Sequence, residues 1–240
     1  IGMEMIWCEA GTFWMGSGNE KGSEKDEAQH KTTLSQGFFL GRYEVTQEEY
    51  EEIIGSNPSR FKGDKRPVEQ LSWLEVVKFC NQLNENERKA KRLTNDWIYT
   101  LPTEAQWEYA CRAGSKTAYS WGDSIVSKNA NSNNSQLNQT GVCGQYEPNK
   151  WGFYDMHGNV LEWCLDWYDS SYGLGDFFLF GEDDPTGPQK GTERVCKGGS
   201  WYDKGHNLRS ASRQSRNPIA RLGYLGFRLA LKRIDIAKVE

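Results

Sequence analysis

The side chains best suited to redox or metal chemistry are six cysteines and three histidines, and their spacing limits what they can do. The cysteines are Cys8, Cys80, Cys111, Cys143, Cys164 and Cys196, and the histidines are His30, His157 and His206. The cysteines form no C-x-x-C pair, which disfavours a zinc ribbon or a thioredoxin-type site. Three dispersed histidines also disfavour a His-ligated metal or a His-centred triad.

Composition excludes further classes of protein. The 240 residues include 29 Lys and Arg against 33 Asp and Glu, a net charge of −4, which disfavours a nucleic-acid partner. The chain holds no apolar run near the ~18–20 residues that a transmembrane helix needs. Ten Trp, 11 Tyr, 10 Phe and 25 Gly indicate tight turns around a ring-filled core.

Three capping boxes predict the helices. Thr46 to Glu49, Ser72 to Glu75 and Thr103 to Gln106 each place a hydroxyl three residues before a Glu or Gln. The first helix should end at Gly55, the second near Asn86 and the third at Gly114. Cys80 and Cys111 lie on the apolar faces of the second and third helices, where we expect buried free thiols.

The rest of the chain predicts short strands and long loops. Strands are expected over 37–45, 194–201 and 226–231, and loops over 115–150 and 169–193. The acidic residues Asp166, Asp169, Glu182, Asp183 and Asp184 are interpreted as solvated loop surface. The expected fold class is α+β, with few short strands and helices and one domain over 1–240.

Several motifs in order resemble one family. They include Leu101 to Ala110 (LPTEAQWEYA), Gly158 to Trp163 (GNVLEW), Gly198 to Trp201 (GGSW) and Gly226 to Arg228 (GFR). Over roughly residues 5–232 the chain resembles the formylglycine-generating-enzyme (sulfatase-modifying factor) domain, a C-type-lectin-like fold. The resemblance implies that fold and, in the enzymes, copper-dependent oxidation of a substrate cysteine.

The resemblance also implies where the functional residues should lie. The two copper-binding cysteines of the enzymes fall on Asp203 and Leu208, and neither side chain can be a thiolate. We therefore expect no enzyme activity and no required cofactor. A structural calcium ion is implied by oxygens at matching positions. Those positions are Asn131, Ser132, Asn159, Val160 and Glu162.

Residues 196–225 lack any regular pattern between anchors that look fixed. A segment kept for packing would show periodicity, whereas a binding surface need not. The same place in this fold is diversified in the variable proteins of retroelements, and the chain resembles the TvpA-type variable lipoproteins of spirochaetes. Every proposed position passes the codon filter of adenine mutagenesis, whereas Trp201, Lys204 and Gln214 fail it. The candidate ligand-binding residues are Cys196, Tyr202, Asp203, His206, Asn207, Ser212, Ser215, Arg216, Ile219, Ala220, Leu222 and Tyr224.

The sequence thus favours a non-enzymatic, surface-displayed protein. We expect Tyr202, His206, Ile219, Leu222 and Tyr224 to form an exposed aromatic and apolar patch that binds an extracellular macromolecule of protein type. The protein should be a monomer, lipid-anchored through an N-terminal segment outside this chain. The alternatives are a copper oxidase or related metalloenzyme, and a catalytically dead peptide-binding partner.

Overall fold

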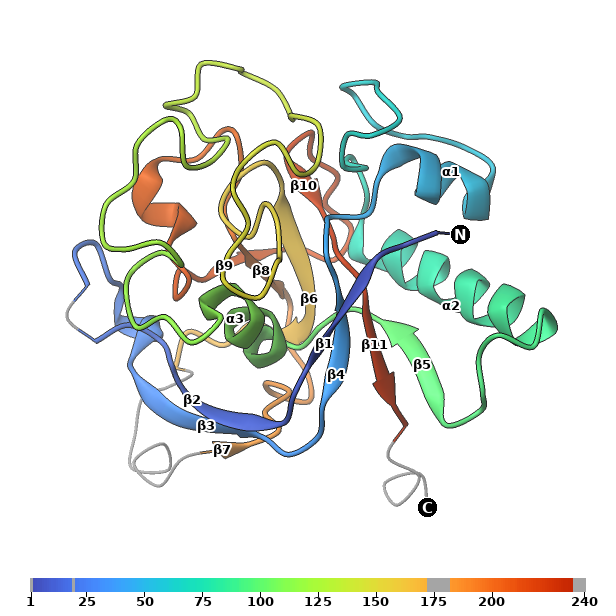
Figure 1. The fold of residues 1–240 in the computed structure, drawn as a ribbon, viewed down its shortest axis with the longest axis horizontal. Helices are drawn as coiled ribbons and strands as arrows, with labels where there is room; N and C mark the ends of the chain where they lie inside the picture. Colours follow the sequence, from blue (N-terminus) through green and yellow to red (C-terminus); the bar gives the residue numbers. More distant parts are fainter. Residues whose placement is uncertain (1, 19, 172–181, 235–240) are drawn as a thin grey trace.

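The computed structural model describes residues 2–18, 20–171 and 182–234, whose strands form three small sheets (Figure 1). The strand orders are β1-β4-β11-β5, β10-β6-β8-β9 and β2-β3-β7. The strands are β1 (Met5–Cys8), β2 (Gly11–Met15), β3 (His30–Leu34), β4 (Phe38–Gly41), β5 (Trp97–Thr100), β6 (Leu161–Trp167), β7 (Glu182–Asp183), β8 (Arg194–Lys197), β9 (Gln214–Arg216), β10 (Leu225–Gly226) and β11 (Ala230–Arg233).

The three predicted helices are present. They are α1 (Gln47–Ile54), α2 (Trp73–Lys89) and α3 (Glu104–Arg112), and each begins with the predicted reciprocal capping box. Gly55 ends α1 with a left-handed φ of 80°. Helix α2 runs three residues beyond the predicted Asn86. Two 3-10 turns, η1 (Lys25–Glu27) and η3 (Gly205–Leu208), were not predicted.

The predicted strands are shorter than expected. Within 37–45 only β4 is a strand, and the strand expected over 194–201 stops at Lys197. The stretch 226–231 divides between β10 and β11, which join different sheets. Residues 115–150 form a loop as predicted. The loop expected over 169–193 contains β7, and its residues 172–181 lie outside the described residues.

Two apolar clusters make the core. One packs α2 against β5, β6 and the chain around β10, with Phe79, Trp163 and Phe227 inside. The other surrounds α3, which contacts β2, β3, β6 and β8. Cys80 and Cys111 are buried free thiols, as predicted. This mixed architecture with long loops confirms the α+β fold class.

Candidate functional site

The segment between β8 and β11 is attached to the rest of the fold by arginines whose side chains are buried. Arg209 donates to both carboxylate oxygens of Glu27, at 2.6 and 2.9 Å. Arg213 donates to both oxygens of Glu104, at 2.7 and 3.0 Å. Both pairs are bidentate, so each fixes the direction of the arginine as well as its position.

A third pair closes the segment at its far end. Arg228 donates to both oxygens of Glu162 at 2.7 Å, and the Trp107 indole adds a bond of 2.6 Å. Both charged side chains of this pair are fully buried. Losing one member of such a pair leaves an uncompensated buried charge, which costs about 3–5 kcal/mol. The segment is therefore pinned at fixed points in the core.

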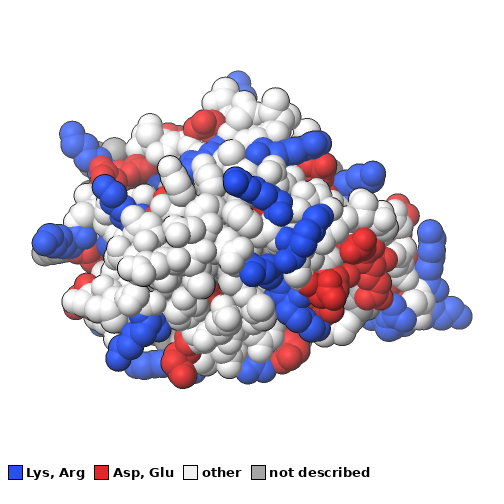
Figure 2. Space-filling view, turned by 90° about the horizontal axis from the view of Figure 1, so that it is seen from above, with Lys and Arg blue, Asp and Glu red and all other residues white. Residues whose placement is uncertain are grey.

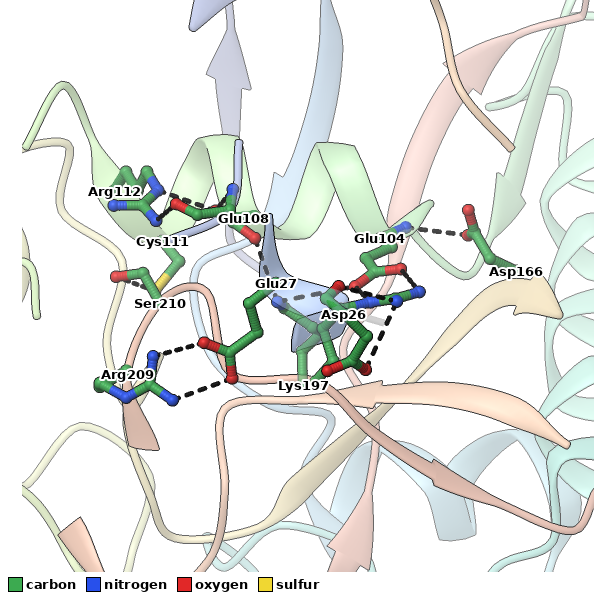
Figure 3. A network of polar contacts seen from close by, with 12 residues as sticks. Asp26, Glu27, Glu104, Glu108, Cys111, Arg112, Asp166, Lys197, Arg209 and Ser210 are labelled. Atoms are coloured by element: carbon green, nitrogen blue, oxygen red, sulfur yellow. Dashed lines mark hydrogen bonds and ion pairs between the residues drawn. The ribbon is translucent and has the colours of Figure 1, made fainter. Parts of the chain in front are cut away.

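Lys197 pins the start of the segment. Its Nζ is fully buried at the end of β8 and lies 3.1 Å from Oε2 of Glu108 (Figure 3). Arg112 donates to the other oxygen of Glu108 at 2.9 Å. Burial raises the pKa of Glu108, but Lys197 and Arg112 outweigh it and lower this pKa to about 2. The Glu108 carboxylate therefore stays ionised at neutral pH and pairs with both cations, while Glu104 lies 3.7 Å from Lys197 and Glu20 lies 3.8 Å from Arg112.

Two glycines turn the chain out of β8. Gly198 and Gly199 have φ values of 92° and 67°, in the left-handed region that favours glycine. A Cβ at Gly199 would lie 2.8 Å from the backbone oxygen of Asn207. The turn therefore needs glycine for its conformation and for its space, and it sets where the following residues emerge.

Beyond this turn, aromatic side chains lie on the surface. The Tyr202 side chain is 65% exposed, and its ring stacks on that of Tyr224 with centroids 5.7 Å apart. The guanidinium of Arg216 lies 5.9 Å from the Tyr224 ring centroid. Ile219 is 70% exposed. These residues give the segment an outward face made of rings, one aliphatic group and one cation.

The predicted ligand-binding residues differ in exposure. Tyr202, His206 and Ile219 are exposed. The half-buried positions are Asp203, Asn207, Ser215, Arg216, Ala220, Leu222 and Tyr224. Leu222 packs against the α2 core cluster, so it contributes less to the expected exposed patch than the sequence suggested.

Two of the predicted contacts lie in the interior. Cys196 is fully buried in β8, where it pairs with Trp163 of β6 and Gln214 of β9. Ser212 is also buried, between the anchors Arg209 and Arg213. Neither side chain reaches the surface, because both stand next to residues that hold the segment in the core. The expectation that they contact a ligand is corrected accordingly.

Asp203 and Leu208, where the family resemblance led us to expect the copper-binding positions, carry structural contacts. Oδ2 of Asp203 accepts from Oγ of Ser200 at 2.6 Å, and Oδ1 accepts from the Asn207 amide at 3.2 Å. Leu208 is fully buried in a small cluster with Tyr119 and Ala130. Both side chains stabilise the turn around η3.

Cys111 is the thiol with a neighbouring imidazole. Its Sγ lies 3.6 Å from Nε2 of His157 and 3.5 Å from Oγ of Ser210. Burial raises the pKa of Cys111 to about 12, and burial lowers the pKa of His157 to about 4. Both groups are neutral at neutral pH, so the pair lacks the thiolate that a nucleophile needs.

The residues proposed for calcium are held by internal hydrogen bonds. Oδ1 of Asn159 accepts from the Gly141 amide at 2.7 Å and from the Asn131 side chain at 3.1 Å. Oδ1 of Asn131 accepts from Ser135 at 2.7 Å. The backbone oxygen of Ser132 also accepts from Ser135, at 2.7 Å.

The two remaining calcium candidates face other partners. The Val160 amide donates to Glu44 at 3.1 Å, and the Glu162 carboxylate is paired with Arg228. Within the described residues, no group of three or more His, Cys, Asp or Glu side chains is arranged to hold a metal. A calcium ion would have to replace the Asn131 and Asn159 hydrogen bonds, so the calcium site stays a prediction.

Two cavities, one of which borders the segment at Arg209, were not predicted from the sequence. One of about 500 Å³ is lined by Arg209, Glu20, Tyr119 and Asp123. Another of about 470 Å³ is lined by four aromatic residues, Phe13, Trp14, Tyr109 and Trp151. Their walls come from segments far apart in the chain, so no local pattern signals them.

The comparisons with known proteins cover nearly the whole chain. The family model of the Sulfatase-modifying factor enzyme 1-like domain matches residues 2–233. The solved structure of Treponema denticola variable protein 1 superposes with a TM-score of 0.81 and 29% identity, covering 94% of each chain. Both matches agree with the resemblance drawn from the motifs.

Curated relatives carry different names. Chaperone protein LppX of Paenibacillus barcinonensis is 30% identical, over 82% of this chain and 78% of its own. The serine/threonine-protein kinase pkn1 of Chlamydia pneumoniae is 31% identical over 95% of this chain, which spans 38% of that protein. The mouse formylglycine-generating enzyme matches at 23% identity. None of the described helices is long and apolar enough to cross a bilayer.

Proposed function

Because this chain belongs to the Sulfatase-modifying factor enzyme 1-like domain family, we propose that it uses that fold as a scaffold for ligand binding without catalysis. One observation carries the proposal. Residues 196–228 alternate between buried ion-paired anchors, such as Arg209 and Arg213, and outward side chains, such as Tyr202 and Ile219. A rigid frame under changeable side chains preorganises a binding surface.

The outward positions are proposed to be diversified by a retroelement. The irregular pattern of residues 196–225 and the codon filter support this, and so does the likeness to a variable protein of Treponema denticola. The DNA next to the gene provides the test. We expect a second copy of the stretch encoding residues 196–229, differing at template adenines, beside a reverse transcriptase gene. Absence of such a copy from the complete genome contradicts diversification.

Surface display through a lipid anchor belongs to the same proposal. A binding surface that changes between sister copies is useful where it meets changing extracellular macromolecules. Protease treatment of intact cells, followed by detection of the protein with an antibody, tests display. A protein that stays protected until the cells are lysed contradicts it.

The absence of catalysis is tested separately. Asp203 and Leu208 cannot supply copper thiolates, so we expect no aldehyde when the protein is incubated with Cu(I), oxygen and a cysteine-containing peptide. Mass spectrometry of the peptide detects the product. Formylglycine in the peptide would show that the chain is an oxidase after all.

A further inference from the structure

We propose that the ligand is a protein segment that contains acidic and aromatic residues. We also propose that the connection between α1 and α2, residues 55–72, selects this class of ligand, independently of which side chains stand at the diversified positions. This inference rests on the proposed function and names the partner of the same surface. The surface comprises residues 56–66 of the connection, residues 214–224, and Trp201 with Tyr202. We call it the Tyr202 surface.

The two segments are in direct contact. The Trp201 ring meets the Phe61 ring edge to face, with centroids 5.5 Å apart. The Gln70 amide donates to the Leu222 oxygen at 3.1 Å. A Cβ on Gly223 would lie 3.3 Å from the side chain of Arg60. The connection therefore forms one wall of the surface that the C-terminal segment completes.

Positive charge is concentrated on this surface although the whole chain has a net charge of −4. Residues 56–66 and 214–224 contain six Lys and Arg against one Asp. The charged residues are Arg60, Lys62, Asp64, Lys65, Arg66, Arg216 and Arg221. Figure 2, which views the molecule from above, shows several Lys and Arg side chains across the middle of that face, with a group of Asp and Glu side chains beside them.

Among the described residues, neighbouring carboxylates form ion pairs with only two of the six cations. Glu48 pairs with Lys65, and Glu75 pairs with Arg221. Buried Glu69 accepts from the Phe61 amide at 2.8 Å, and Glu193 accepts from Ser215 at 2.6 Å. With Asp64 and with Asp203 beside Tyr202, the carboxylates equal the cations in number, so the charge open to a ligand is that of the cations without an ion pair. In the described part of the chain, Arg60 and Arg216 form no ion pair, and Arg216 donates only to neutral oxygens.

The rings add an apolar component. Tyr202 stacks on Tyr224 with 13° between the ring planes, and Arg60 lies 5.0 Å from the centroid of Phe61. Exposed Tyr next to Arg is typical of the anchors that dominate protein interfaces, because both bury much area and also donate hydrogen bonds. A ligand segment with an aromatic side chain between carboxylates would complement this surface, because its ring can contact the rings and guanidinium groups while its carboxylates pair with the cations.

One feature favours a protein partner over a nucleic acid. The cations of the surface are matched in number by carboxylates, whereas a nucleic acid presents one phosphate charge at each nucleotide. A short acidic protein segment can place single carboxylates beside Arg60 and Arg216 and uncharged residues elsewhere. The connection also lies outside the diversified segment. Substitutions at Tyr202 or Ile219 would therefore change which acidic protein binds. Arg60 and the other cations of the connection would be unchanged, so the ligand would still be an acidic protein.

The probe for the test is a short random copolymer of Glu and Tyr, poly(Glu,Tyr), which carries carboxylates and phenol rings without extending far beyond the surface. Binding is measured by fluorescence anisotropy of the labelled copolymer, in salt of about 20 mM and about 300 mM. We expect binding that weakens at the higher salt. Polyglutamate should bind more weakly because it lacks rings, and poly(Lys,Tyr) should not bind.

Two sets of variants locate the binding. Charge reversal in Arg60→Glu/Arg216→Glu, or truncation in Tyr202→Ala, should weaken poly(Glu,Tyr) binding about tenfold or more, a change that corresponds to about 1.4 kcal/mol. The matched controls are Lys89→Glu/Lys91→Glu, which reverses two exposed cations at the end of α2, and Trp14→Ala, which removes an exposed ring from another part of the molecule. Both should bind as the original protein does. Circular dichroism confirms that each variant is folded.

Each outcome decides the inference. Absence of binding, or equal loss in the controls and the surface variants, overturns it. Equal or tighter binding of a single-stranded oligothymidylate also overturns it, because the partner would then be a nucleic acid. A template copy beside the gene together with no poly(Glu,Tyr) binding would leave the proposed function intact and reject only this ligand class.

Discussion

Arg213 and Glu104 join the C-terminal segment to the first turn of α3 through two hydrogen bonds of 2.7 and 3.0 Å. Both side chains are almost fully buried. In the sequence Arg213 lies between the exposed residues Tyr202 and Ile219. The strength of its ion pair with Glu104 therefore determines how rigid the proposed binding surface is.

Glu104→Gln should therefore destabilise the fold. It keeps the shape of the side chain but removes the nearest counter-charge of the buried Arg213 guanidinium, whose remaining carboxylate is that of Asp26 at 3.6 Å. It also removes a carboxylate that lies 3.7 Å from the buried Nζ of Lys197. The loss of such a buried charge partner costs about 3 kcal/mol. Urea denaturation measures the loss in the free energy of unfolding. Glu85→Gln is the matched control, because Glu85 pairs with Lys89 on the exposed face of α2. Equal effects of the two substitutions would contradict the role given to the buried pair.

Asp166 predicts a pH dependence of stability. Burial and the nearby Glu104 raise the pKa of Asp166 to about 7. Between about pH 4 and about pH 7 the folded protein keeps a proton that the unfolded chain has lost, so this group contributes less stability as pH rises. Asp166→Asn carries no such proton and can still accept from the Glu104 amide, which donates to Asp166 at 2.8 Å.

The stability of Asp166→Asn relative to the original protein should consequently increase from about pH 5 to about pH 8, as measured by urea denaturation across this range. Asp169→Asn is the control. Hydrogen bonds from Ser171 lower the pKa of Asp169, so this carboxyl is ionised in both states over the same range. A flat difference for Asp166→Asn would show that its carboxyl ionises normally.

Gly199→Ala should cost more than Gly55→Ala. Both glycines have positive φ, 67° and 80°. A Cβ at Gly55 meets nothing within 4 Å, whereas at Gly199 it meets the Asn207 oxygen and Leu208. Gly55→Ala should lose about 1 kcal/mol from backbone strain alone, and Gly199→Ala a further ~1 kcal/mol or more. Thermal unfolding measures the stability of both variants. Similar losses of stability would show that the Cβ at residue 199 causes no clash with Asn207 and Leu208.

Calcium should have little effect on stability. The side-chain oxygens of Asn131 and Asn159 already accept hydrogen bonds, and the Glu162 charge is balanced by Arg228. The expected difference in Tm between excess calcium and excess EGTA is below about 1 °C, since a ligand stabilises only by binding the folded state. A rise of several degrees with calcium would establish the site that the family resemblance implies.

The sequence predicted the features that depend on near neighbours. A capping box is complete within four residues, so Thr46, Ser72 and Thr103 could be recognised without any tertiary information. The irregular pattern of the C-terminal segment was a weaker guide, since Tyr202 and Ile219 are exposed as expected, whereas Cys196 and Ser212 are buried.

The sequence could not predict features that depend on distant partners. Asp166 was interpreted as solvated, but β6 carries it into the core beside Glu104. Among the unpredicted strands, β1, β2, β3, β5 and β9 have three to five residues each, too few for alternation to stand out. The seven-residue β6 is buried along most of its length, so it shows no alternation of apolar and polar residues. No pattern in the sequence indicated that Phe61 contributes to the Tyr202 surface, because its partner Trp201 is distant in the sequence.

The separation of the anchor partners also bears on how the protein folds. Glu27 is 182 residues before Arg209, and Glu104 is 109 residues before Arg213. At about 5–20 residues per second, a ribosome makes Arg209 roughly 10–40 s after Glu27. Until then several carboxylates of the nascent chain lack their counter-charges, and contacts of this span form slowly. The outward face is thus organised last, and a chain shortened before Arg209 leaves Glu27, Glu104 and Glu162 without the arginines that neutralise them.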